Sequence, residues 1–164
     1  MIYQAGPAEA LERCRPLLAA LGQRIIAVDD EPHLANVLKL VTNFMAIAVN
    51  ETLSEAFTLA DKAGLKSEPV LEMLQVLFPS LVFEVFAKRI AASDFYSPGA
   101  NVRLWLKDVG HMRQFADQVA APLPLADLAY RHLLAALARG RGDLDAAALV
   151  TVVRELAGLA PGTR

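Results

Sequence analysis

Four polar residues recur at helical spacing within the apolar segment 33–64, namely Asn36, Lys39, Asn43 and Asn50. On an α-helix, which turns about 100° per residue, they fall within a sector of about 60°. Because most of the remaining circumference is apolar, we expect the helix to be buried on several sides and Lys39 to point into a cleft. A buried ammonium must be paired, and burial favours the neutral amine that proton transfer uses. In the alternative interpretation, Lys39 extends to the surface and the asparagines hydrogen-bond neighbouring helices.

The pair Lys107 and Asp108 is a second candidate, because it follows the apolar residues Trp105 and Leu106. Adjacent residues of a helix point about 100° apart, so the two charges would not face one ligand together. A solvated ion pair is therefore the alternative interpretation of Lys107 and Asp108.

The other ionisable residues do not form a recognisable catalytic or metal site. The spacing of His33, His111 and His132 is not that of metal ligands, so we predict no metal. Glu51 and Glu55 lie four residues apart without an opposing pair of carboxylates, which favours a dimer or loop contact over acid/base catalysis. The sequence also lacks the G-x-S-x-G, G-x-G-x-x-G and G-x-x-x-x-G-K-[ST] motifs.

Composition narrows the class of protein. With 164 residues, of which 55% are hydrophobic and 21% charged, the chain can bury one core. A net charge of −2 gives no basic surface for nucleic acid. Cys14 is the only cysteine, which excludes a disulfide framework and favours a cytoplasmic location. The most apolar stretch, 34–49, is shorter than the roughly 20 residues of a membrane span, and the N-terminus does not resemble a signal peptide.

One long helix is the main predicted element. No proline or glycine interrupts the run from His33 to Gly64, and Gly64 lies where a glycine is expected to end a helix. A helix of about 32 residues is about 48 Å long. It would form the central element of the fold.

Shorter elements precede and follow it. We expect a helix between Pro7 and Gly22, with Gly22 as its terminating glycine, and then a strand at 24–28 whose available partner is 1–3. Further helices are expected at 69–78, 81–92, 101–121, 124–139 and 144–158. The predicted fold class is therefore all-α, a helical bundle around the long helix, preceded by a short helix and strand.

Several motifs in this order resemble one family. They are Asn36-Val-Leu-Lys39-Leu-Val-Thr-Asn43-Phe, then Glu55-Ala-Phe-Thr-Leu-Ala-Asp-Lys-Ala-Gly64, then Leu104-Trp-Leu-Lys107-Asp108-Val, and finally Pro122-Leu-Pro124. The chain resembles the C-terminal helical domain of the β-hydroxyacid dehydrogenases, which include 3-hydroxyisobutyrate dehydrogenase and, more distantly, 6-phosphogluconate dehydrogenase and imine reductases. The resemblance covers nearly the whole chain.

The resemblance implies roles for individual residues. In this family such a domain is joined by the long helix to a Rossmann domain that holds NAD or NADP, and it also forms the homodimer. The lysine matching Lys39 is the general acid/base, and the asparagine matching Asn43 helps to bind the substrate. Asn36 lies on the same face and is a further substrate-binding candidate, while Lys107 matches a lysine near the cofactor.

The chain departs from the family pattern in three places. It contains no dinucleotide fingerprint, so residues 1–30 are interpreted as the end of a nucleotide-binding domain and residues 31–164 as the helical domain. The glycine-rich turn that usually precedes the lysine is replaced by Asp29-Asp30-Glu31-Pro32-His33. An aromatic residue that is often near the cofactor aligns with Ala100.

The sequence thus predicts a substrate-binding and dimerisation domain of an NAD(P)-dependent oxidoreductase that acts on a small β-hydroxyacid or a related carbonyl compound. We expect no turnover without a Rossmann domain, which could be separately encoded. The expected partners are a second copy of the chain and a small-molecule substrate, with neither nucleic acid nor membrane. The alternative is a non-catalytic helical dimerisation or interaction module, or a truncated gene product, derived from such an enzyme.

Overall fold

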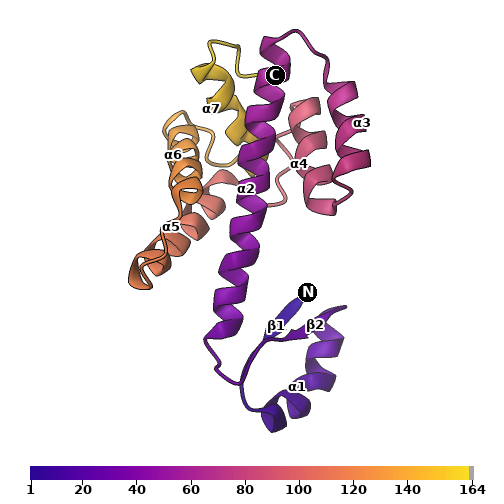
Figure 1. Cartoon of the computed structure of the whole chain (residues 1–164), viewed down its shortest axis with the longest axis vertical. Coiled ribbons are helices and arrows are strands. Elements are labelled where there is room, and N and C mark those ends of the chain that lie inside the picture. Colours follow the sequence, from indigo (N-terminus) through magenta and orange to yellow (C-terminus); the bar gives the residue numbers. More distant parts are fainter. Residues whose placement is uncertain (163–164) are drawn as a thin grey trace. The chain divides into compact units, whose positions relative to one another are not determined.

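The predicted long helix is confirmed in the computed structural model, which describes residues 1–162. Helix α2 runs from Leu34 to Lys62 (Figure 1). It ends where Gly64 adopts a φ of +77°, and the Leu65 N–H donates to the carbonyl of Ala60 at 2.9 Å. A residue with a side chain is strained at such a φ, which explains the glycine.

The chain divides into two compact units, Met1–Asn43 and Phe44–Arg164. The first contains strand β1 (Ile2–Gln4), helix α1 (Ala8–Leu21), strand β2 (Ile25–Ala27) and the start of α2. The two strands pair in parallel, with Ile2 opposite Ile25. The predicted strand and its partner are therefore confirmed as a short β-α-β segment. The functional boundary expected near residue 30 stays a prediction.

Gly22 ends α1 as predicted. Its φ is −156°, which is extended backbone open to any residue, so backbone conformation does not explain a glycine here. Close packing explains why position 22 is a glycine, because a Cβ atom there would lie 2.8 Å from Cδ1 of Ile2. The glycine allows the end of α1 to approach β1 closely.

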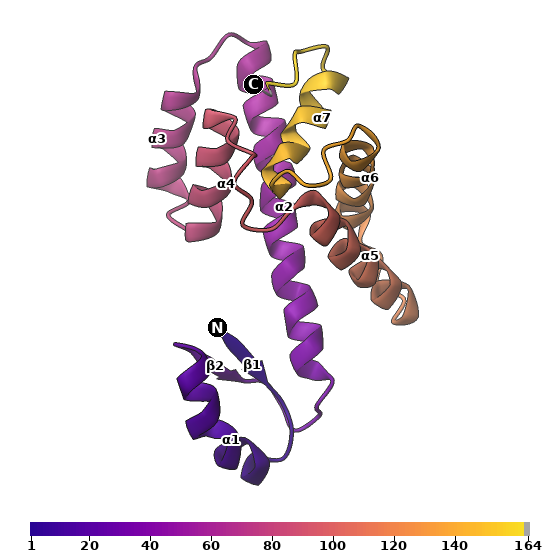
Figure 2. The same cartoon turned by 180° about the vertical axis from the view of Figure 1, so that it is seen from behind.

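The second unit is a helical bundle. Besides the rest of α2 it contains α3 (Ser67–Leu77), α4 (Leu81–Ala92), α5 (Val102–Gln118), α6 (Pro124–Ala138), the short 3₁₀ helix η1 (Ala146–Ala148) and α7 (Leu149–Leu156). Figures 1 and 2 show α3 and α4 on one side of α2, with α5, α6 and α7 on the other. Among the described residues the chain is mostly helical, with seven α-helices, which confirms the predicted fold class.

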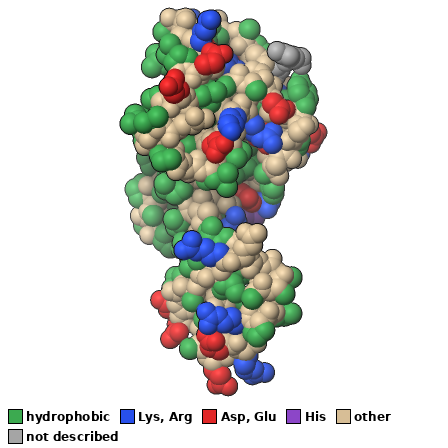
Figure 3. Space-filling model, turned by 90° about the vertical axis from the view of Figure 1, so that its right-hand side faces the viewer, with side chains coloured by type: hydrophobic (Ala, Val, Ile, Leu, Met, Phe, Trp, Pro, Cys, Tyr) green, Lys and Arg blue, Asp and Glu red, His purple; other side chains and the backbone are tan. Residues whose placement is uncertain are grey.

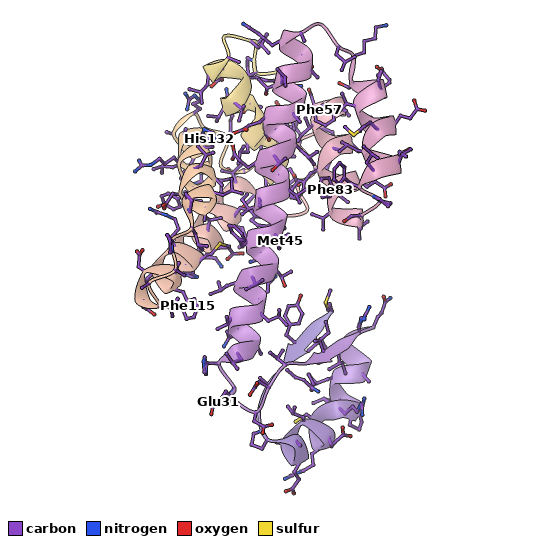
Figure 4. The ribbon with its side chains drawn as sticks, in the orientation of Figure 1. Glu31, Met45, Phe57, Phe83, Phe115 and His132 are labelled. Carbon is purple, nitrogen blue, oxygen red and sulfur yellow. The ribbon has the colours of Figure 1, made fainter. Side chains whose placement is uncertain are left out.

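The core of this unit forms around the C-terminal half of α2. Leu53 and Phe57 are at most 1% exposed and pack with Ile90 of α4 and Val150 of α7. Figure 4 shows Phe83 and His132 on opposite sides of α2, with Phe57 on the helix itself. Near its midpoint, in contrast, Met45 is 58% exposed. Burial on several sides is therefore a property of the C-terminal half of α2.

Helix α5 begins at a polar junction with the segment before α7. The side chain of Asn101 accepts a hydrogen bond from the Leu104 N–H at 2.9 Å, as an N-cap does. Asp145 is buried and accepts from the N–H groups of Gly99 and Ala147, each at 3.0 Å. These bonds fix the N-terminus of the helix that carries Lys107.

No helix in the described part of the chain has both the length and the apolar character to cross a membrane.

Candidate functional site

Lys39 and Asn43 interact directly. They lie one turn apart on α2, and the Lys39 ammonium donates a hydrogen bond of 2.8 Å to Oδ1 of Asn43. Asn43 is only 9% exposed, so its amide is held in place by its surroundings. The bond uses one of the three N–H groups of the ammonium, which leaves two that can reach another oxygen. The pair therefore presents an ammonium group of fixed orientation on the surface of α2.

The expectation that Lys39 points into a cleft is wrong for this chain. Lys39 and Asn36 are both exposed. The apolar neighbours Val37, Leu38 and Leu40 are only partly buried. The alternative interpretation of Lys39, a side chain that reaches the surface, describes its position.

Asn50 does not share the position of Lys39. It is completely buried, and its Nδ2 donates to the carbonyl of Ala146 in η1 at 2.9 Å. It thus connects α2 with the segment before α7, as the alternative interpretation of the asparagines predicted. The four polar residues therefore divide into an exposed pair, Asn36 and Lys39, and a buried pair, Asn43 and Asn50.

Lys107 lies on α5, in the second unit. Its Nζ is 2.9 Å from Oδ1 of Asp108, and its side chain is 55% exposed. The alternative interpretation, an ion pair at the surface, describes this geometry. A pair of this kind contributes little to stability, so a role for Lys107 would lie in binding.

A pair missed by the sequence analysis joins α2 to α6. Oε1 of Glu51 is 2.7 Å from Nδ1 of His132, and Glu51 is 1% exposed. The second carboxylate oxygen of Glu51 is buried without a hydrogen-bond partner in the described structure. The contact predicted for Glu51 at a loop or dimer surface is therefore wrong, because Glu51 is inside the bundle. A carboxylate close after the apolar run 44–49 was the signal, since a buried carboxylate has to be paired.

The pair perturbs the titration of His132. The hydrogen bond that the imidazole donates to Glu51 raises the pKa of His132 above 6.5, and the charges of Glu51 and Glu55 add to this effect. Burial of the imidazole lowers the pKa and opposes them. Because the raising effects prevail, the charged imidazole is the form that the fold stabilises.

The described residues do not gather into a metal site, since they contain no group of three or more His, Cys, Asp or Glu side chains suited to one. The start of α1 in the β-α-β segment is not suited to bind a phosphate. The turn between β1 and α1 is Ala5-Gly6-Pro7, and Pro7 has no N–H to offer at the helix start. The turn between β1 and α1 therefore lacks a backbone N–H that a phosphate at this helix start would need.

The chain matches a known protein family and two known oxidoreductases along most of its length. The family described as NAD-binding of NADP-dependent 3-hydroxyisobutyrate dehydrogenase matches residues 34–153. An uncharacterized oxidoreductase of Bacillus subtilis, YfjR, is 39% identical over 153 residues, which are 93% of this chain and 54% of that protein. The 3-sulfolactaldehyde reductase of Escherichia coli is 28% identical over 161 residues, or 97% of this chain and 53% of the enzyme. The chain thus spans about half the length of the curated relatives it matches.

Solved structures show the same fold. The 3-hydroxyisobutyrate dehydrogenase of Salmonella typhimurium superimposes with a TM-score of 0.81 at 26% identity, covering 90% of this chain and 52% of that one. The enzyme of Mycobacterium tuberculosis superimposes with a TM-score of 0.80 at 23% identity, covering 92% and 53%. These matches confirm the resemblance indicated by the motifs around Lys39 and Lys107.

Proposed function

The chain belongs to the 3-hydroxyisobutyrate dehydrogenase family through its C-terminal helical domain, and we propose from this premise that it is the substrate-side domain of an NAD(P)-dependent oxidoreductase. Its substrate would be a small β-hydroxyacid or the related carbonyl compound. One observation carries the proposal, namely the 2.8 Å hydrogen bond from the exposed Lys39 to the buried Asn43. This hydrogen bond orients the ammonium of Lys39, a potential proton donor, on the helix that carries the family motif.

The proposed chemistry is general acid/base catalysis by Lys39. NAD(P), when bound, supplies or accepts the hydride. As a carbonyl is reduced, the Lys39 ammonium donates a proton to the carbonyl oxygen, and in the reverse direction the neutral amine accepts the hydroxyl proton. Asn43 holds Nζ of Lys39 in position. The exposed Asn36, which lies one turn before Lys39, is available to hydrogen-bond the substrate. Lys107 is proposed to contact the cofactor as a point charge.

The dinucleotide phosphates need a cradle outside the described residues. Two paired parallel strands do not make a stable sheet, because parallel strands are normally buried on both faces. None of the residues of α1 is buried, and Leu17 and Leu21 of this helix are 68% and 74% exposed. The β-α-β segment is therefore proposed to join a larger nucleotide-binding sheet, in the same polypeptide or in a separately encoded partner.

A homodimer is also proposed, and an apolar surface on the second unit supports it. Exposed hydrophobic side chains lie on the α3 side of this unit (Figure 3). Val76 and Leu77 of α3 and Leu81 of α4 are 73%, 63% and 75% exposed. Exposed apolar patches of this kind mark interaction sites. Sedimentation of the 17.7 kDa chain at micromolar concentration is expected to give the mass of two chains. A monomer over the whole concentration range would contradict it.

Reconstitution tests the proposed activity. The chain is assayed for NADH and NADPH oxidation with small aldehyde acids, alone and fused to the part of the Bacillus subtilis relative that this chain does not match. The isolated chain is expected to be inactive, whereas the fusion turns over and binds the cofactor in calorimetry. Turnover by the isolated chain would refute the division of labour proposed here. A folded fusion that binds cofactor but reduces no small carbonyl compound would instead favour a non-catalytic interaction module.

A further inference from the structure

Two hydroxyl groups connect strand β1 with the first turns of α2. The Tyr3 hydroxyl oxygen lies 2.7 Å from Oγ1 of Thr42. Oγ1 of Thr42 in turn donates to the carbonyl oxygen of Leu38, one turn earlier, at 2.9 Å. A threonine hydroxyl has a single proton, so Thr42 must accept from Tyr3. The hydrogen bonds therefore run in one direction, from the strand through Thr42 to the backbone of the helix.

The connection lies next to the candidate catalytic pair. Leu38 and Thr42 form one i, i+4 row on the helix, and Lys39 and Asn43 form the adjacent row, one residue further along. Neighbouring rows are rigidly related, because each residue adds about 100° of rotation. The hydrogen bond that holds Thr42 to the strand therefore also fixes the direction in which the Asn43 side chain projects from the helix. The Lys39 ammonium, which is bonded to Asn43, is oriented with it.

The entry into α2 does not provide this orientation. The Leu34 N–H donates to the carbonyl of Glu31 at 3.1 Å, and the Val37 N–H donates to that of His33 at 3.2 Å. These bonds connect the start of α2 to the turn that precedes it, whereas the hydrogen bond of Tyr3 connects α2 to the sheet. The rotation of the first turns of α2 relative to β1 is thus set from a residue 39 positions away in sequence.

We propose that Tyr3 and Thr42 are positioning residues for proton transfer, which hold the row of Lys39 and Asn43 at a fixed rotation relative to the β-α-β segment. This inference rests on the proposed catalytic role of Lys39. It adds that strand β1, through the Tyr3 hydroxyl, determines where the proton donor points. In a complete enzyme, loss of the Tyr3 hydroxyl lowers kcat by about 10-fold to 100-fold, because small misplacement of a catalytic group has effects of this size. KM changes less than twofold, since substrate binding groups remain.

The test uses three variants that differ in one group. Tyr3→Phe removes the donor, Thr42→Val removes the receiving hydroxyl at nearly unchanged shape, and Thr42→Ser keeps that hydroxyl. In the full 164-residue chain, ¹⁵N NMR follows the Lys39 Nζ and Asn43 Nδ2 signals. Tyr3→Phe and Thr42→Val are expected to move both signals, whereas Thr42→Ser leaves them at the wild-type positions. Tyr130→Phe, which removes a hydroxyl from α6, is the matched control and leaves both signals unchanged.

Two outcomes would overturn the inference. One is a pair of unchanged Lys39 and Asn43 signals in folded Tyr3→Phe and Thr42→Val chains, with folding checked by circular dichroism. The other is an equal displacement in Thr42→Ser and Thr42→Val, which would mean that the hydroxyl is not the connecting group. Because the spectra need no turnover, a failure of the proposed catalytic role of Lys39, seen as full activity of Lys39→Met, is recognised separately.

Discussion

Replacing His132 by leucine should destabilise the helical bundle strongly. The substitution leaves Glu51, which is 1% exposed, without its 2.7 Å partner. Removing one member of a buried pair costs about 3–5 kcal/mol, because the remaining charge is desolvated and uncompensated. With a urea m-value of about 2 kcal/mol/M for a unit of this size, the unfolding midpoint falls by roughly 1.5–2.5 M. The double variant Glu51→Leu/His132→Leu should recover most of this loss, since apolar replacement of both partners is often neutral.

The same pair predicts how wild-type stability depends on pH. The folded pKa of His132 is raised above 6.5, so its contribution is fully present below 6.5 and is lost as the pH rises through the folded pKa. Urea unfolding at pH 6 and pH 8 measures both effects. His111→Leu, at an exposed histidine of α5, is the control and should change stability by less than about 0.5 kcal/mol. Equal midpoints for His132→Leu and His111→Leu, or a wild-type midpoint that does not fall above pH 6.5, would refute this reasoning.

Three further predictions concern single positions of the helical bundle. Gly64→Ala should cost about 1 kcal/mol in urea unfolding, because φ is +77° there while space for a Cβ is open; no loss would contradict this. Asn50→Ala should cost about 0.5–1.5 kcal/mol, since the Ala146 carbonyl loses the Asn50 donor but keeps the Leu149 N–H, and an unchanged midpoint would exclude the Asn50 bond as important. The hydrogen bond from Arg141 lowers the pKa of Glu155 below 4.5, so this contribution is present above pH 4.5 and is lost as the pH falls through the folded value. Glu155→Gln should therefore show a weaker acid-side loss of stability than the wild type, and equal acid profiles would contradict it.

The elements of the fold were predictable because their signals are local. Gly64 ends α2 at the expected position, and Leu81–Ala92 is the predicted helix α4 without a shift at either end. The strand at Ile25–Ala27 was visible from its β-branched residues, but its parallel pairing with Ile2–Gln4 depends on contacts distant in sequence. Gly22 shows the limit, because its need for close packing against Ile2 is a tertiary fact that the local pattern does not contain.

The candidate site was predictable in part. The interval between Lys39 and Asn43 places them one turn apart, and the structure joins them by a hydrogen bond. Their burial was not predictable, because helical periodicity gives the face of a residue but not which half of a helix the core surrounds. The pairing of Glu51 with His132 also needed the structure, since the partners are 81 residues apart on different helices. The apolar run 44–49 before Glu51 indicated only that a carboxylate there needs a partner.

The central claim is that Lys39 is the proton donor, and kcat of Lys39 variants in the reconstituted enzyme tests it most directly. Lys39→Met should lower kcat by about 10²–10⁴-fold with little change in KM. Lys39→Arg should be similarly impaired, because a guanidinium keeps the charge but does not release its proton near neutral pH. Lys66→Met, at an exposed lysine before α3, should retain wild-type kcat. A kcat within about fivefold of the wild type for folded Lys39→Met would contradict the account.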